Sequence, residues 1–194
     1  MGHNRNDRHS AIILDTNVLI EAMGVWLDPA QATRSRSAAL LVLEQSFLRH
    51  RLCFTRPTMQ EFCEVALDLK GKTRMPPSAA MRRVDFIKFI EARMQLVEPR
   101  PSSLRCRDPK DQMILEAAQG ANAVHIISAD ADILTLSHER HCRFLHPQAY
   151  ADILAERLAQ EPEAARRKGK SLTADGQKRE GFKQRGHLQV LKTR

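Results

Sequence analysis

The sequence of 194 residues contains no long apolar run. A helix that crosses a bilayer needs about 18 or more consecutive apolar residues, and no stretch of that kind occurs. The first ten residues, MGHNRNDRHS, are polar and charged, whereas a secretion signal requires an apolar segment. These absences exclude membrane-spanning and secreted classes, so we expect a soluble, cytoplasmic protein with no membrane partner.

Paired cysteines are also missing. Cys53, Cys63, Cys106 and Cys142 are scattered, and no two of them form a CxxC motif. In a chain without a secretion signal such thiols are expected to stay reduced, which excludes a disulfide framework. The fold must therefore depend on an apolar core, and an apolar content of 42% is sufficient for one domain of this length.

Several common catalytic motifs are absent. The sequence has no Gly-rich phosphate loop, no HExxH zinc motif and no Ser-His-Asp set. A phosphoryl-transfer enzyme with Asp15 as nucleophile would require a second aspartate two residues later, where this chain has Asn17. The common hydrolase classes that depend on these motifs are thereby excluded.

Positive charge is concentrated at the C-terminal end. Residues 161–194 contain ten Lys or Arg against four Asp or Glu, which accounts for +6 of the net charge of +8. The stretch lacks periodicity, so we expect a disordered basic tail. Such a tail suggests a polyanionic partner, most commonly nucleic acid, although a purely solubilising tail is the alternative. The candidate nucleic-acid-binding residues are Arg166, Arg167, Lys168, Lys170, Lys178 and Arg179.

The body of the chain, residues 10–160, follows a flexible N-terminus of residues 1–9. It alternates short apolar runs with helical patterns, which is typical of an α/β fold with a mostly parallel sheet of four or five strands. The predicted strands are residues 11–14, 51–55, 95–97, 123–128 and 143–145. The continuous apolar sequence of the first strand indicates burial on both faces of the sheet.

Two helices illustrate how boundaries and faces are predicted. Asp108 and Pro109 provide an N-cap and a first-turn proline, so a helix is predicted to begin there and to end at Gly120. A second helix is predicted over residues 37–48. The side chains that periodicity assigns to one face of it are Ala38, Leu41, Val42, Gln45 and Leu48.

Four acidic residues stand where a predicted strand ends or a helix begins. Asp15 follows the first strand, Glu61 lies in the early turns of the helix after Pro57, Asp111 lies just after Pro109, and Asp130 follows the fourth strand. Each one alone is explained by helix capping or by a favourable interaction with a helix dipole. In an open parallel sheet, however, the carboxyl ends of the strands form the edge at which ligands bind.

Four carboxylates gathered at one edge would repel one another. Two like charges about 4 Å apart, at an effective dielectric constant of about 20, cost about 4 kcal/mol. The cluster therefore needs protons or cations, and oxygen ligands without His or Cys favour Mg²⁺ or Mn²⁺. A divalent ion held in this way activates water and neutralises charge on a phosphate, which is the chemistry of phosphodiester hydrolysis. Thr16, Asn17 and Ser128 lie beside the carboxylates and are predicted to orient them.

Four blocks of the sequence resemble the PIN-domain nucleases, in particular the toxin components of bacterial toxin-antitoxin pairs. The blocks are IILDTNVLI at residues 12–20, PTMQE at 57–61, RDPKDQMIL at 107–115 and residues 121–134. They occur in the family's order across roughly residues 10 to 150. The resemblance implies a PIN-like three-layer α/β/α fold.

The resemblance also implies a site. Asp15, Glu61, Asp111 and Asp130 correspond to the family's acidic quartet, which binds metal and is catalytic, with Thr16 or Asn17 in support. The block that usually contains Thr-Gly-Asp-x-Asp is Ser-Ala-Asp-Ala-Asp here, so either Asp130 or Asp132 is the metal-facing aspartate, and Asp108 is a further candidate ligand. Relatives of this kind commonly dimerise and are bound by an antitoxin.

The predicted function is that of a metal-dependent endoribonuclease acting on RNA, as the toxin of an antitoxin-controlled pair. A non-toxin nuclease that processes RNA or cleaves DNA remains an alternative. A nucleic-acid-binding protein with a degenerate acidic site and an active basic tail is the alternative from another class. The presence of all four expected carboxylates argues against that last alternative.

Overall fold

The computed structural model describes residues 10–68, 75–136 and 142–160. The predicted flexible N-terminus and the basic tail, with its six candidate RNA-binding cations, lie outside these ranges. The chain divides into two compact units, residues 1–155 and residues 156–194. Of the second unit, only residues 156–160 are described, and they are helical.

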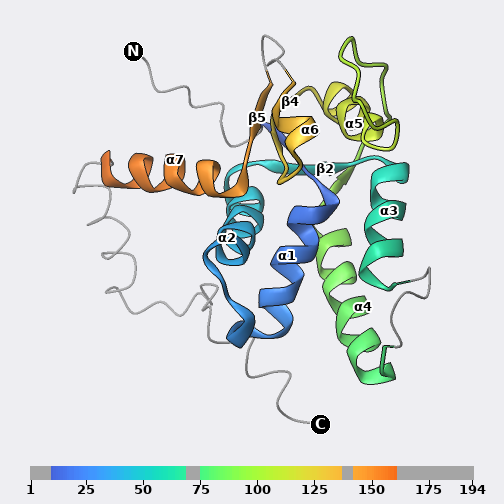
Figure 1. Ribbon diagram of the computed structural model, residues 1–194, viewed down its shortest axis with the longest axis vertical. Coiled ribbons are helices and arrows are strands. Elements are labelled where there is room, and N and C mark those ends of the chain that lie inside the picture. Colours follow the sequence, from blue (N-terminus) through green and yellow to red (C-terminus); the bar gives the residue numbers. More distant parts are fainter. Residues whose placement is uncertain (1–9, 69–74, 137–141, 161–194) are drawn as a thin grey trace, which may run out of the picture. The chain divides into compact units, whose positions relative to one another are not determined.

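The first unit alternates strands and helices (Figure 1). The strands are β1 (Ala11–Leu14), β2 (Arg51–Phe54), β3 (Gln95–Leu96), β4 (Ala123–Ile127) and β5 (Arg143–Leu145). The helices are α1 (Thr16–Leu27), η2 (Pro29–Gln31), α2 (Arg34–Arg49), α3 (Arg56–Ala66), α4 (Pro77–Glu91), α5 (Gln112–Ala121), α6 (Ala131–Leu134) and α7 (Pro147–Gln160). None of the helices in the described ranges combines the length and the apolar character needed to span a bilayer.

The five strands form one sheet in the order β3-β2-β1-β4-β5, and every neighbouring pair is parallel. The predicted α/β class with a mostly parallel sheet of four or five strands is therefore confirmed. From β1 the chain first adds strands on one side, β2 and β3, and then returns to the other side for β4 and β5. The strand order therefore reverses between β1 and β4, at the centre of the sheet.

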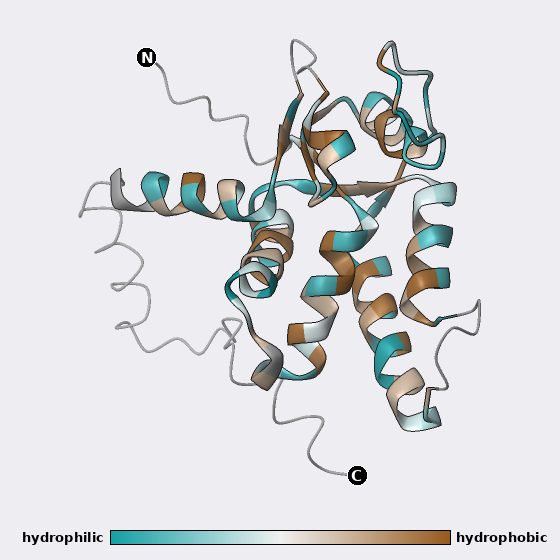
Figure 2. Cartoon of the chain, viewed as in Figure 1, coloured by the Kyte–Doolittle hydropathy of each residue, from teal (hydrophilic) through white to brown (hydrophobic). Residues whose placement is uncertain are grey.

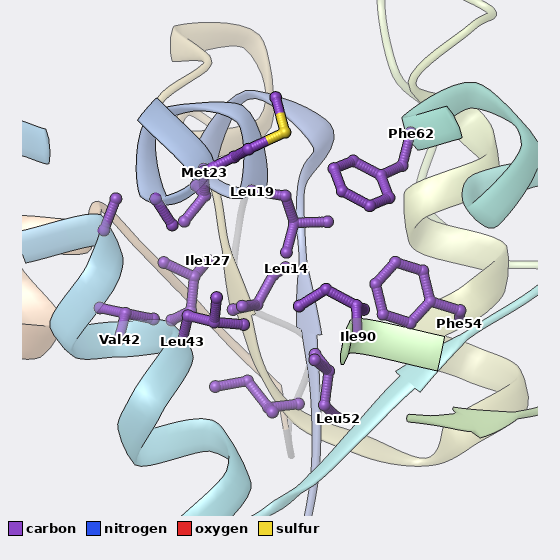
Figure 3. Close-up of a cluster of buried hydrophobic side chains, with 14 of the residues drawn as sticks. Leu14, Leu19, Met23, Val42, Leu43, Leu52, Phe54, Phe62, Ile90 and Ile127 are labelled. Atoms are coloured by element: carbon purple, nitrogen blue, oxygen red, sulfur yellow. The ribbon is translucent and has the colours of Figure 1, made fainter. Parts of the chain in front are cut away.

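β1 is buried on both faces of the sheet, as its unbroken apolar sequence predicts. Ile12 and Leu14 belong to a large core that they share with α1, α2, α3 and α4. Figure 3 shows the part of this core around Leu14. Ala11 and Ile13 point into a second core, on the opposite face, which they share with α5 and α6. The outer helices carry both brown and teal residues in Figure 2, as amphipathic helices packed on one side do. Helices on both faces of the sheet make the predicted three layers.

The predicted start of α5 is wrong by three residues. The helix begins at Gln112, and residues 108–111 form a turn before it. Asp108 Oδ1 accepts a hydrogen bond from the backbone N–H of Lys110 at 2.9 Å, and the Asp108 carbonyl accepts one from Asp111 at 3.1 Å. Asp and Pro are favoured in turns as well as at helix starts, so sequence alone did not separate the two.

The face of α2 that periodicity indicates is buried only in part. Leu41 is 38% exposed and Leu48 is 72% exposed, although periodicity places both on one face with Ala38 and Val42. The residues that are buried are Ala38, Ala39, Val42, Leu43 and Ser46. Ser46 is accommodated because its hydroxyl donates to the Val42 carbonyl at 2.7 Å, which satisfies its only donor inside the core.

Two glycines within helices offer a matched test of this packing. A Cβ at Gly120 would lie 2.0 Å from the Glu98 carbonyl oxygen, so α5 can approach the segment after β3 only because residue 120 has no side chain. A Cβ at Gly24 in α1 would meet nothing within 4 Å. We expect Gly120→Ala to lower the free energy of unfolding by about 1–3 kcal/mol through overpacking.

Gly24→Ala should instead raise the free energy of unfolding by roughly 0.5–1 kcal/mol, because alanine is the better helix former. Urea denaturation of both variants measures the two effects in parallel. Equal stability of the two variants would contradict the close approach of α5 to Glu98.

Candidate active site

The carboxyl ends of β1 and β4 place two acidic segments next to each other. The strands are parallel neighbours, with Leu14 opposite Ile127, so Asp15 and Ser128 follow the strands at the same level. The backbone N–H of Asp15 donates to the Ile127 carbonyl at 2.9 Å. This is where the strand order reverses, and ligands of open α/β sheets bind at such a point.

Asp15 is held by side chains and does not cap α1. It occupies the N-cap position, yet its carboxylate makes no capping hydrogen bond. Its Oδ2 accepts from Ser128 Oγ at 2.5 Å and from Asn17 Nδ2 at 2.8 Å, and the residue is only 8% exposed. The capping explanation for Asp15 is therefore wrong, and the carboxylate has a fixed orientation at the sheet edge.

Glu61 comes to the same edge from α3. A capping box begins this helix, in which Thr55 Oγ1 accepts from the Thr58 N–H and Thr58 Oγ1 accepts from the Thr55 N–H. The Glu61 Oε2 atom accepts a hydrogen bond from Thr16 Oγ1 at 2.8 Å. Thr16, predicted to orient a carboxylate, therefore links the start of α1 to Glu61.

Asp130 and Asp132 have different surroundings, which bears on which of them faces a metal. Asp130 Oδ1 accepts from the Asp132 N–H at 2.7 Å and so caps α6, as the helix-capping explanation anticipated. The Asp132 carboxylate is 2.8 Å from Arg107 Nη2 and accepts from Arg107 Nε at 3.0 Å. Asp132 is thus already paired with a cation.

Small polar groups connect the two strand ends. Ser128 Oγ donates to Asp15 and accepts from the Asp130 N–H at 2.9 Å. Asn17 donates to Asp15 through its amide nitrogen, and its Oδ1 accepts from the Ala129 N–H at 3.3 Å. Ser128 and Asn17 are therefore each in contact with Asp15 and with the segment that leads to Asp130.

Asp111 shares the electrostatic field of the other carboxylates. It stands at the N-cap position of α5 without a side-chain capping bond. Its pKa is raised to about 6, first by burial and then by the charges of Asp130, Asp15, Asp108 and Glu61. Because all the other members of the predicted quartet act on it, the fold has brought the four carboxylates into one electrostatic cluster.

The same field acts on neighbouring groups. Burial raises the pKa of Asp15, the hydrogen bonds from Ser128 and the Thr16 backbone oppose this, and Glu61 and Asp130 add to the rise. Burial also raises the pKa of the Cys106 thiol to about 11, together with four nearby aspartates. Burial of an acidic group among other negative charges is expected to raise its pKa in this way.

Two polar side chains next to the site were not singled out from the sequence for a role. Arg107 pairs with Asp132 across 25 positions of the chain. Gln112 accepts from the Cys106 N–H at 3.1 Å and donates to the Leu104 carbonyl at 3.2 Å, which ties the loop before the site to the start of α5. Contacts between distant segments of this kind have no local sequence signal.

The donor set fits a hard divalent cation. Asp15 and Asp111 offer carboxylates that do not cap a helix, and the pKa of each is raised first by burial and then by the negative charges around it. Within the described ranges, no group of three or more His, Cys, Asp or Glu side chains is placed to hold a metal ion. Mg²⁺ commonly takes only one or two carboxylates and keeps several waters, so a complete protein cage is not required.

Comparison with known proteins gives a family. The PIN domain profile matches residues 11–132, which is more than half of the chain. A solved structure, VapBC2 from Rickettsia felis bound to a DNA fragment from its promoter, aligns with 11% identity and a TM-score of 0.46, covering 70% of this chain and 98% of that one. No curated protein shows significant sequence similarity. PIN domains are in general metal-dependent nucleases, and this chain belongs to the PIN-domain family.

Proposed function

We propose that this protein is a Mg²⁺- or Mn²⁺-dependent endoribonuclease that hydrolyses RNA phosphodiester bonds at the carboxyl edge of its sheet. The observation that carries the proposal is the position of Asp111, where burial and the nearby charges of Asp130, Asp15 and Glu61 raise its pKa to about 6. Carboxylates that are held close together despite their mutual repulsion are typical of a functional site that binds cations.

Within this proposal Asp15, Glu61, Asp111 and Asp130 hold the ions. A divalent ion bound there lowers the pKa of a bound water and neutralises charge on the phosphate oxygens. Ser128 and Asn17 keep the Asp15 carboxylate in one orientation, and Thr16 does the same for Glu61. Preorganised ligands of this kind reduce the reorganisation needed when ion and substrate bind.

RNA is the proposed substrate, and the basic tail is proposed to add affinity without reading sequence, through Arg166, Arg167, Lys168, Lys170, Lys178 and Arg179. The sequence resemblance to toxin components extends the proposal to the toxin of an antitoxin-controlled pair, with a cognate antitoxin and a second copy of the chain as partners. We also propose a cytoplasmic location.

Replacing Asp15 tests the proposed chemistry. We expect Asp15→Asn to abolish Mg²⁺-dependent cleavage of a labelled structured RNA, because the variant loses one charged ligand, and to remain folded because repulsion is relieved. EDTA should abolish cleavage by the wild-type protein as well. Asp85→Asn is the matched control, since Asp85 is an exposed aspartate of α4 outside the cluster. A folded Asp15→Asn protein that still cuts RNA would rule out the role of Asp15.

The raised pKa of Asp111 predicts how stability depends on pH without metal. Between about pH 4 and about pH 6 the folded protein retains a proton that the unfolded chain has released, so the free energy of unfolding falls as pH rises through this window. Asp111→Asn removes this loss. We therefore expect the variant to melt at a higher temperature than wild type in EDTA at neutral pH, and the difference to shrink towards about pH 4.

Mg²⁺ offers the complementary measurement. Because an ion that binds only the folded state stabilises it, Mg²⁺ should raise the wild-type melting temperature at neutral pH and raise that of Asp111→Asn less. Asp85→Asn should follow wild type in both series. An Asp111→Asn variant that melts below wild type at neutral pH in EDTA would contradict the predicted repulsion.

Truncation after Gln160 tests the tail. We expect the truncated protein to bind RNA more weakly, with a shallower dependence on salt, because up to ten cations are removed, while cleavage at high RNA concentration persists. Fluorescence anisotropy over a salt series measures the binding. Unchanged binding would make the tail a solubilising segment. A full-length protein that binds but does not cut RNA, and loses binding on truncation, would favour a degenerate acidic site.

A further inference from the structure

Arg107 occupies an unusual position beside the acidic cluster. Its side chain is 85% exposed, yet its Nε and Nη2 atoms both contact Asp132 Oδ2, at 3.0 and 2.8 Å. Asp108, the next residue, and Asp111, four positions further on than Arg107, belong to the acidic cluster. The negative charges of four aspartates of this cluster act on Cys106, the residue before Arg107. An exposed guanidinium is therefore held at the rim of the site.

We propose that Arg107 binds a backbone phosphate of the RNA strand at this rim, and that Asp132 positions Arg107 instead of ligating metal. The proposal rests on the proposed ribonuclease function and assigns it a substrate contact within the folded domain, separate from the basic tail. Asp132 is a positioning residue in this arrangement, since it acts through the arginine.

The charge balance at the edge is the first argument. The carboxylates gathered there are Asp15, Glu61, Asp108, Asp111, Asp130 and Asp132. These six negative charges repel an approaching RNA strand. Bound divalent ions would offset the repulsion only close to where they bind. A fixed cation beside the ions supplies attraction for the adjoining part of the strand, and guanidinium matches phosphate geometry better than ammonium does.

The geometry of the pair is the second argument. Both contacts use the Nε–Nη2 edge of the planar guanidinium and one carboxylate oxygen, Asp132 Oδ2. The Nη1 group is therefore directed away from Asp132. An exposed ion pair stabilises a fold by at most about 1 kcal/mol, so fold stability alone is a weak reason for this one. The pair does restrict the rotamers of a long side chain, which lowers the entropy lost when a phosphate binds.

The backbone that carries Arg107 is itself fixed, which is the third argument. Gln112 accepts from the Cys106 N–H and donates to the Leu104 carbonyl, so residues just before Arg107 are tied to the first turn of α5. On the other side, Asp108 Oδ1 accepts from the Lys110 N–H. The arginine thus projects from a braced loop, as a preorganised binding residue requires.

Arg107→Gln is the test, and Arg143→Gln is its matched control. Arg143 is also exposed, so both variants lose one surface charge. Because Arg143 begins β5, it lies at the amino ends of the parallel strands, whereas the site lies at their carboxyl ends. With the labelled RNA and Mg²⁺, we expect Arg107→Gln to raise KM roughly tenfold with kcat nearly unchanged, the loss expected for one charged hydrogen bond. Arg143→Gln should leave both constants near wild type.

Binding is measured separately, in the Asp15→Asn background with Mg²⁺, where the RNA stays intact if the proposed chemistry holds. The plot of log affinity against log salt should become shallower by about 0.7 when Arg107→Gln is added, which corresponds to one lost phosphate contact on a single strand. Asp132→Asn should raise KM in the same direction, while the Mg²⁺ concentration for half-maximal cleavage stays unchanged.

The outcomes separate this inference from the function on which it rests. Wild-type protein that cuts RNA, together with equal KM values for Arg107→Gln and Arg143→Gln, would overturn the phosphate contact and leave the nuclease intact. A shift in the Mg²⁺ requirement of Asp132→Asn would make Asp132 a metal ligand and overturn its positioning role. Wild-type protein that cuts no RNA would overturn the proposed function, and the salt slopes would then decide on Arg107 alone.

Discussion

The parallel pairing of β1 with β4 is the constraint on which the candidate site depends. These strands are the centre of the sheet, and their register brings Leu14 opposite Ile127, so the chain leaves both strands at one level. Asp15 and Ser128 are then close enough for a direct hydrogen bond, although 113 positions separate them in the chain. Two further parts of the site adjoin this contact: Thr16 begins α1 and donates to Glu61, and Ser128 accepts from the Asp130 N–H.

Burial of β1 on both faces makes that constraint strong. Ile12 and Leu14 contribute to one core and Ala11 and Ile13 to the other, so a one-residue shift of the strand would exchange both sets. Burial of apolar side chains in the two cores thus fixes β1, and with it the position of Asp15 at the end of the strand. This packing opposes the repulsion between the like charges that gather at the strand ends.

The acidic residues are not equivalent, and their partners distinguish them. Asp15 and Asp111 stand at helix N-cap positions without capping the helix, whereas Asp130 caps α6 and Asp132 pairs with Arg107. Among the described residues the first two have neither a helix cap nor a cation as partner, and burial and the neighbouring negative charges raise the pKa of each. A cation at this edge would lower the repulsion that acts on both carboxylates, which links the electrostatics of the edge to the proposed chemistry.

The sequence by itself determined the α/β class, the position of every strand to within about two residues and the acidic residues at strand ends, because apolar runs and turn signals are local. It did not determine that α5 begins at Gln112, since Asp-Pro is favourable in a turn and at a helix start alike. It also did not determine that Leu41 and Leu48 lie outside the core, because adjacent helical faces of α2 are both apolar and packing selects one. Only the tertiary structure decided the long-range partners, which are Ser128 for Asp15, Thr16 for Glu61 and Arg107 for Asp132, because these contacts join segments whose separation along the chain leaves no periodic or local signal.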